Sequence, residues 1–313
     1  MIQRYGRIAI CIPTYRRPES LELLLAEVLH QVGKFSPAVS FGVLVVDNDL
    51  NRSASEVTQK FGPSVSYLFE SKKGVASVRN ALVSAAIAYG ADCLVFVDDD
   101  EIPSSNWLTE ITRPWLESSV KMVAGPVLPI VPLAACPLLV RSGLLDRVRH
   151  RTGTYLGEAG TGNLLVSMDV IEKLGPGPWF DAGLNLIGGE DAHFTRAAVE
   201  VAGPIFWSDE AVVLEWLPPS RLTFKWFALR SIRTAGADFL MNKPRPGNRL
   251  RSFAGGCSRI ALSIPPLAFY LVFARIDSGH FRRLFRGIGF VLASLGVFHR
   301  EYRGDGALGK SNP

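Results

Sequence analysis

Short apolar runs alternate with helical repeats over the first hundred residues. Four runs of four or five mostly apolar residues are candidate strands: residues 8–12, 42–46, 65–69 and 94–97. Runs of this kind are typical of strands that are covered on both faces of a sheet. Apolar residues repeat at helical spacing in 18–32 and in 75–89. The alternation predicts an α/β fold with a mostly parallel central sheet flanked by helices.

Polar clusters follow three of the predicted strands. They occupy residues 13–17, 47–49 and 98–101. The carboxyl ends of parallel strands meet at one edge of a sheet, and open α/β sheets bind ligands outside that edge. We therefore expect the three clusters to share one functional site.

The cluster with the strongest chemical signal is Asp98-Asp99-Asp100. Adjacent carboxylates repel one another, and a bound divalent cation would remove that cost. Mg²⁺ and Mn²⁺ suit carboxylate and phosphate oxygens. In an extended segment Asp98 and Asp100 can face one ligand while Asp99 faces elsewhere. A solvated acidic turn is the alternative explanation.

A second carboxylate pair, Glu190-Asp191, follows two glycines at the start of a predicted helix. An ionised carboxylate beside an acceptor hydroxyl can act as a general base. An ordinary acidic first turn of a helix explains the pair equally well.

Three further residues have both a functional and a structural interpretation. Asp47 could accept a hydrogen bond from a base or a ribose, or it could simply end a strand. Arg79 could reach a phosphate, or it could lie on a solvated helix face. Trp179 could stack on a sugar ring, although a Trp-Phe pair is more often part of a core.

The motifs taken together carry a resemblance that none carries alone. In chain order they are IAICIPTYRRP at 8–18, VVDN at 45–48, Arg79-Asn80-Ala81, VDDD at 97–100, TGN at 161–163, FD at 180–181 and GED at 189–191. This order and spacing resembles the inverting family 2 glycosyltransferases of the GT-A fold, over about residues 6–240. The resemblance implies that fold, with a C-terminal helical extension.

The resemblance also implies roles for individual residues. The donor nucleotide site would be formed by Pro13, Thr14, Tyr15, Arg16, Asp47, Arg79 and Asp98. Asp100 would bind the metal that bridges the diphosphate. Asp191 would be the catalytic base, and Glu190 would assist acceptor binding.

The same resemblance leaves the remaining metal ligand open. Many relatives have a metal-binding His after the Glu-Asp pair, whereas the corresponding stretch here offers Glu215. A carboxylate can ligate Mg²⁺ or Mn²⁺. Arg221, Arg230 and Arg233, with Trp179, would contact the acceptor or a phosphate.

Charge is divided unevenly along the chain, whose net charge is +5. Residues 1–220 carry 18 basic and 25 acidic side chains, and 221–313 carry 16 and 4. This division predicts a catalytic domain at 1–220 and a basic helical region at 221–313. No nucleic-acid recognition motif accompanies the charge, so nucleic acid is not an expected partner.

Two apolar stretches in the basic region bear on membranes. Residues 260–274, interrupted by Pro265-Pro266, and 287–298 are both shorter than the ~20 residues of a transmembrane helix. Basic residues beside short apolar helices suit an anionic membrane surface. The alternatives are an ordinary core helix pair with a solvated basic face and a hairpin inserted into the bilayer.

The combined hypothesis is a metal-dependent inverting glycosyltransferase. It would use a UDP-sugar with Mn²⁺ or Mg²⁺, and a lipid-linked oligosaccharide or polysaccharide as acceptor. It would work at the cytoplasmic face of the plasma membrane as a peripheral or monotopic protein. The alternatives are a sugar nucleotidyltransferase and a membrane subunit that binds nucleotide sugar without turnover.

Overall fold

The structure is a computed structural model in which the chain forms two compact units. It describes residues 6–35, 39–133, 135–185, 188–242, 247–272 and 276–299. Unit 1 comprises Met1–Ile130, Arg147–Ala182 and Glu190–Trp216. Unit 2 comprises Val131–Asp146, Gly183–Gly189 and Leu217–Pro313. Residues 131–146, 183–189 and 217–220 therefore belong to unit 2 although they lie within the first 220 residues.

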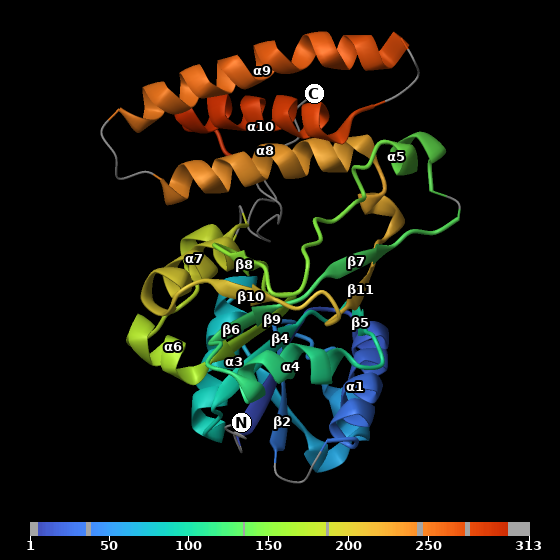
Figure 1. Ribbon diagram of the computed structural model, residues 1–313. Coiled ribbons are helices and arrows are strands. Elements are labelled where there is room, and N and C mark those ends of the chain that lie inside the picture. The colour runs from blue at the N-terminus through green and yellow to red at the C-terminus, as the bar shows by residue number, and fades with distance from the viewer. Residues whose placement is uncertain are drawn as a thin grey trace. The chain divides into compact units, whose positions relative to one another are not determined.

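A mixed, mostly parallel sheet forms the centre of unit 1 (Figure 1). Its strand order is β3 (Val65–Phe69), β2 (Ser40–Asp47), β1 (Arg7–Thr14), β4 (Cys93–Val97), β9 (Asn163–Ser167), β6 (Met122–Ala124), β10 (Ile205–Trp207), β8 (Tyr155–Leu156). The first four strands are mutually parallel, as are β6 and β10. Strands β9 and β8 run antiparallel to their neighbours. The predicted α/β fold and the four predicted strands are confirmed.

Alternate residues of β1 build two cores on opposite faces of the sheet. Ile8, Ile10 and Ile12 pack with α1 (Pro18–Val32), α2 (Ser55–Lys60) and α4 (Trp107–Glu117). Ala9 and Cys11 pack with α3 (Val75–Tyr89), α6 (Met168–Leu174) and α7 (Glu190–Ala202). Because both faces are covered, the strand is apolar throughout, which is why the sequence shows a continuous run.

A small second sheet lies beside the end of β4. It consists of β5 (Glu101–Pro103), β11 (Val213–Trp216) and β7 (Val127–Ile130), in that order. β11 pairs antiparallel with β5, and this register sets Glu215 directly opposite Glu101. The pairing brings Glu215, from the end of unit 1, close to the aspartate cluster at residues 98–100.

Unit 2 is helical. Its elements are α5 (Pro137–Arg141), η3 (Pro219–Arg221), α8 (Phe224–Met241), α9 (Asn248–Val272) and α10 (Ser278–Ser294). Two further 3-10 helices in the described residues are η1 (Gly62–Ser64) and η2 (Ala182–Leu184). Helix α10 packs against both α8 and α9 (Figure 1).

Glycines allow the helices of unit 2 to approach closely. A Cβ at Gly287 would lie 2.9 Å from the carbonyl oxygen of Gly256, and one at Gly289 would lie 2.5 Å from that of Ile232. Helix α9 continues through Pro265-Pro266. That is a difference from the interruption expected there, although each proline lacks the amide donor of a regular helical residue. None of the helices in the described ranges is both long enough and apolar enough to cross a bilayer.

Candidate functional site

The carboxyl ends of β1, β2 and β4 lie at one edge of the large sheet. Thr14 at the end of β1 pairs with Asp47 at the end of β2, and β4, parallel to β1, ends immediately before Asp98. The structure therefore brings the three polar clusters of the sequence to the same edge. This is the edge at which open α/β sheets bind ligands.

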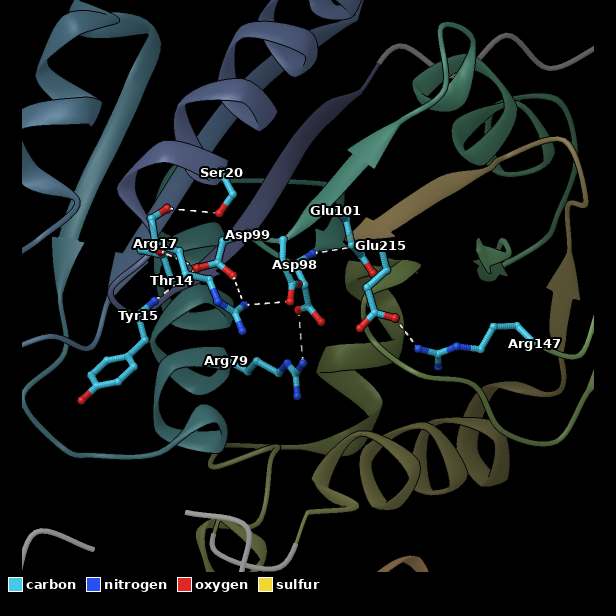
Figure 2. A network of polar contacts seen from close by, with 11 residues as sticks. Thr14, Tyr15, Arg17, Ser20, Arg79, Asp98, Asp99, Glu101, Arg147 and Glu215 are labelled. Carbon is cyan, nitrogen blue, oxygen red and sulfur yellow. Dashed lines mark hydrogen bonds and ion pairs between the residues drawn. The ribbon is translucent and has the colours of Figure 1, made fainter. Parts of the chain in front are cut away.

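Asp99 is a buried acceptor for the loop that follows β1 (Figure 2). It accepts hydrogen bonds from Thr14 Oγ1 at 2.8 Å, the Tyr15 amide at 3.3 Å and Arg17 Nη1 at 2.7 Å. Burial raises the pKa of the Asp99 carboxyl, and Arg17 and Thr14 oppose the rise. Asp99 thus ties β1 to β4. Residues 99 and 100 form a turn rather than an extended segment, and Arg17 Nη1 contacts both Asp99 and Asp100, so the expected alternation, with Asp99 facing away from Asp100, is not found.

Asp100 is bound to the same arginine. Arg17 Nη1 lies 2.9 Å from its Oδ2. Burial raises the pKa of Asp100 to about 6, with Arg17 opposing the rise and Asp98, Asp99 and Glu215 adding to it. The Asp100 carboxyl is therefore in a site where a positive charge is strongly favoured.

Arg79 joins the aspartate cluster to the Glu-Asp pair. Its side chain is buried, and it donates to Glu190 Oε1 at 2.5 Å and to Asp98 Oδ1 at 3.3 Å. Burial works against the charge of Arg79, but the surrounding carboxylates outweigh it and raise the pKa of the guanidinium. Burial also raises the pKa of Glu190, against the opposing effect of Arg79. Two acidic motifs more than ninety positions apart thus form one charged site.

The Gly160-Thr161-Gly162 segment lies against both groups of carboxylates. A Cβ at Gly162 would be 2.6 Å from Glu101 Oε1 and 3.2 Å from Asp98 Oδ2. A Cβ at Gly160 would be 3.5 Å from Asp191 Oδ2. The segment before β9 therefore passes so close to the site that a side chain at residue 162 would displace the buried Glu101 carboxylate.

Glu101 and Glu215 complete the acidic cluster. Glu101 is buried and accepts a hydrogen bond from the Asp98 amide at 2.9 Å (Figure 2). Burial and the neighbouring carboxylates raise its pKa well above the ordinary value. Glu215 pairs with Arg147, and the Trp216 amide donates to the Asp100 carbonyl at 3.2 Å. Strand pairing between β5 and β11 is what places Glu215 near Asp100.

The side chains of Asp100 and Glu215 are suitable ligands for a hard divalent cation. Both offer carboxylate oxygens, and Mg²⁺ is commonly held by one or two carboxylates together with substrate phosphates. In the part of the chain that the structure describes, three or more His, Cys, Asp or Glu side chains are nowhere arranged as a ready-made metal cage. The remaining ligands of a cation would therefore come from phosphate oxygens. In this structure the Asp100 carboxylate faces Arg17 and the Glu215 carboxylate faces Arg147.

Asp47 is buried and accepts three hydrogen bonds. Its donors are the Asp49 amide at 2.8 Å, the Ala54 amide at 3.0 Å and the Tyr67 hydroxyl at 3.2 Å. Burial, followed by the Asp47 charge, raises the pKa of Tyr67 to about 12. These contacts are those of a strand-ending turn, and contact between Asp47 and a nucleotide base stays a prediction.

The other residues of the predicted nucleotide pocket lie around the end of β1. Pro13 and Thr14 are its last two residues, whereas Tyr15 is exposed just beyond it. Arg16 lies 5.0 Å from the Tyr15 ring centroid, and its Nε is 3.1 Å from Asp49 Oδ1. An arginine stacked on an exposed tyrosine offers both a flat surface and a positive charge to a ligand.

Trp179 is held by an asparagine of α3. Asn80 Oδ1 accepts from the Trp179 amide at 2.8 Å and the Phe180 amide at 2.9 Å. Its Nδ2 donates to the Phe180 carbonyl at 2.8 Å. The Trp179 ring is partly buried against the core, which agrees with the structural interpretation, and its contact with a sugar stays a prediction.

The three arginines predicted to bind phosphate belong to unit 2. Arg221 and Arg230 lie 5.9 Å and 5.0 Å from the Trp226 ring, and Arg233 is on the same helix, α8, as Arg230. Their phosphate-binding role stays a prediction.

Several important residues were not singled out from the sequence. Arg17 stands inside the first motif beside Arg16, and Asn163 stands inside TGN. Asn163 accepts from Trp107 Nε1 at 2.9 Å and donates to the Ala211 carbonyl at 2.6 Å. Arg17 and Asn163 both lie in motifs identified in the sequence, so the sequence contained a signal for their importance. Arg147 lies in no motif, and only its pairing with Glu215 reveals it.

Comparison with known proteins identifies the family. Residues 9–131 match the model of Glycosyl transferase family 2. The chain is 31% identical over 236 residues to the Succinoglycan biosynthesis protein ExoM of Rhizobium meliloti (strain 1021), an alignment that covers 72% of each protein. The chain therefore belongs to glycosyltransferase family 2, and it is a glycosyltransferase. The resemblance seen in the motifs is confirmed.

Two solved structures share the fold. S. aureus TarS 1-349 in complex with UDP matches with a TM-score of 0.54 at 15% identity, covering 96% of this chain and 95% of that one. The mannosyltransferase PcManGT from Pyrobaculum calidifontis, in complex with GDP-Man and Mn2+, matches with a TM-score of 0.53 at 13% identity, covering 94% and 74%. These likenesses confirm the GT-A fold.

Proposed function

We propose that this glycosyltransferase is a metal-dependent inverting enzyme that uses a UDP-sugar. The observation that carries the proposal is the Arg79 bridge, because it joins Asp98, on the donor side, to the Glu190-Asp191 pair. A donor and an acceptor hydroxyl must meet within a few ångströms for transfer, and this bridge puts the residues assigned to each in one site.

The donor half of the site is the edge formed by β1, β2 and β4. Pro13, Thr14, Tyr15, Arg16 and Asp47 are proposed to surround the nucleotide, with Asp98 on the ribose side. The UDP bound to TarS and the GDP-Man bound to PcManGT support a nucleotide donor. UDP is our choice, since the UDP complex aligns with nearly the full length of both chains.

Asp100 and Glu215 are proposed to hold Mn²⁺ or Mg²⁺. Support comes from their carboxylate chemistry, the acidic side chains of Asp98, Asp99 and Glu215 near Asp100, and the Mn2+ bound in PcManGT. When bound, the cation would stabilise the charge that develops on the departing diphosphate. Arg17 and Arg147 face these carboxylates in this structure, and Arg17 is also held by Asp99, so a bound cation would replace their contacts with Asp100 and Glu215.

Asp191 is proposed to be the general base. It stands in the first turn of α7, where the helix N-terminus favours the ionised carboxylate. It would remove the proton of the acceptor hydroxyl as the oxygen attacks the anomeric carbon on the face opposite the leaving diphosphate. One displacement inverts the anomeric configuration, and no covalent sugar-enzyme intermediate forms. Glu190 is proposed to position the acceptor, with its charge compensated by Arg79.

The acceptor is proposed to be a lipid-linked oligosaccharide or a polysaccharide at the cytoplasmic face of the plasma membrane. The basic balance of residues 221–313 and the name of the relative ExoM, a succinoglycan biosynthesis protein, support this choice. Arg221, Arg230, Arg233 and Trp179 are proposed to contact the acceptor or its phosphate.

A donor screen tests the proposal. UDP-, GDP- and dTDP-sugars are titrated into the protein by calorimetry, with Mn²⁺, with Mg²⁺ and with a chelator. We expect metal-dependent binding of a UDP-sugar, and a product whose anomeric proton coupling shows inversion in NMR. Equal binding with the chelator, or retention of configuration, would overturn the metal or the inverting assignment respectively.

A further inference from the structure

Helix α9 has one covered side and one open side. Gly256 and Ser263, seven residues apart, are its buried positions in the described structure, and they mark the stripe that packs on α10. Large apolar side chains occupy other sides of the same helix and are exposed: Leu250 at 74%, Phe253 at 39%, Leu262 at 62%, Ile264 at 54% and Phe269 at 62%. At about 100° per residue they form two groups, Leu250 with Phe253 and Ile264, and Leu262 with Phe269, on either side of the line opposite the packed stripe. We call these five residues the α9 apolar face.

Exposing these apolar side chains to water is unfavourable in free energy. Covering a Leu, Ile or Phe side chain fully is worth about 1.5–3 kcal/mol. Five such residues on one helix are more than a single exposed leucine of the kind found on most protein surfaces. The α9 apolar face is suited to contact with another apolar phase or surface.

Charge on the helix selects the kind of partner. Helix α9 contains Arg249, Arg251 and Arg259 and no acidic residue. Arg259 lies 4.9 Å from the Phe290 ring of α10, whereas Arg249 and Arg251 are exposed beside Leu250. An apolar face bordered by arginines, without acids, complements a surface that is apolar within and anionic at its boundary.

We propose that α9 lies in the plane of an anionic membrane, with the α9 apolar face buried among the lipid acyl chains and Arg249 and Arg251 at the headgroups. This proposal rests on the membrane location given under the proposed function and makes it specific to one surface. The helix does not cross the bilayer, in agreement with its hydropathy. Its α10-facing stripe stays packed, so docking needs no rearrangement of unit 2.

The test is sedimentation with vesicles of phosphatidylglycerol and phosphatidylcholine, in the absence of donor and acceptor. We expect the full chain to bind these vesicles and to bind pure phosphatidylcholine vesicles at least about tenfold more weakly. Phe253→Ser with Ile264→Ser should weaken binding at least about tenfold. The matched control is Leu23→Ser with Ile87→Ser, which changes exposed apolar residues of unit 1 and should leave binding within about twofold.

A second measurement reports whether α9 enters the membrane. Cys257 is exposed on α9, and Cys136 is the other exposed cysteine. In a Cys136→Ser background, an environment-sensitive fluorophore on Cys257 should shift to the blue with anionic vesicles. The same label on Leu23→Cys, in a background lacking both exposed cysteines, should not shift.

Two results would overturn the proposal. One is vesicle binding that the α9 double variant leaves unchanged while circular dichroism shows both proteins folded. The other is an absence of vesicle binding together with a dimer, in sedimentation equilibrium, that the same variant dissociates, because the face would then belong to a second copy. Neither measurement requires turnover, so failure here is distinguishable from failure of the proposed reaction.

Discussion

Replacing Arg79 with methionine removes the cation that bridges Asp98 and Glu190. The Arg79 and Glu190 side chains are only 7% and 8% exposed, so water cannot replace the lost charge, whereas Asp98 is a third exposed and is partly screened. Breaking a buried ion pair by removing one partner costs about 3–5 kcal/mol. We expect Arg79→Met to lower the free energy of unfolding by this amount at pH 7.5, as measured by urea denaturation.

The loss should depend on pH with a defined sign. Burial already raises the pKa of Glu190, and removal of Arg79 raises it further. Between the unfolded pKa of about 4.3 and the folded pKa, the folded variant holds a proton that the unfolded chain has released. Its stability therefore falls as pH rises through that window, by up to about 1.4 kcal/mol per pH unit. The difference from the wild type should be smaller at pH 5 than at pH 7.5.

Two further variants make the reasoning refutable. Arg196→Met removes an arginine that pairs with Glu158, but both side chains are more than a third exposed, so the loss should stay below about 1 kcal/mol. Adding Glu190→Gln to Arg79→Met should recover a large part of the stability. A loss under about 1 kcal/mol for Arg79→Met, or a larger loss that neither low pH nor Glu190→Gln relieves, would refute the buried-charge account.

Two packing predictions concern the start of β9. Asn163→Leu leaves the Trp107 indole nitrogen and the Ala211 carbonyl without their partner, while the Pro126 carbonyl keeps the Val213 amide. It should cost about 3 kcal/mol or more in urea unfolding, against under about 0.5 kcal/mol for the exposed Asn51→Leu. Equal losses at the two sites would contradict the hydrogen-bond network. Gly162→Ala puts a Cβ 2.6 Å from Glu101 Oε1 and should cost about 1–3 kcal/mol, whereas Gly157→Ala, in open space, should be neutral in the same assay. A neutral Gly162→Ala would show that the site can widen.

Strand and helix positions in unit 1 followed from local patterns because both faces of its central strands are covered. Ile8 to Ile12 reads as one apolar run for that reason, and Asp98 was identifiable because it stands where such a run ends. The location of Glu215 was predicted only through the resemblance. Its approach to Asp100 depends on the β5–β11 register, which has no local signature.

Ion-pair partners were the part that the sequence did not specify. Arg16 and Arg17 are adjacent and chemically identical, yet Arg17 bridges Asp99 and Asp100 while Arg16 turns to Asp49. The choice is made by the backbone of the turn, where Arg16 has a positive φ of 56°. Arg147 reaches Glu215 from a segment with no motif. Contacts between distant segments are fixed by tertiary structure alone.

The most direct test of the proposed chemistry is release of UDP from a UDP-sugar in the presence of Mn²⁺ and acceptor, with wild type, Asp191→Asn and the surface control Glu117→Gln compared. Loss of a general base lowers turnover by about 10²–10⁴-fold. We predict a loss in this range for Asp191→Asn with UDP affinity unchanged in calorimetry, and wild-type turnover for Glu117→Gln. Full transfer by Asp191→Asn would contradict the assignment of the base.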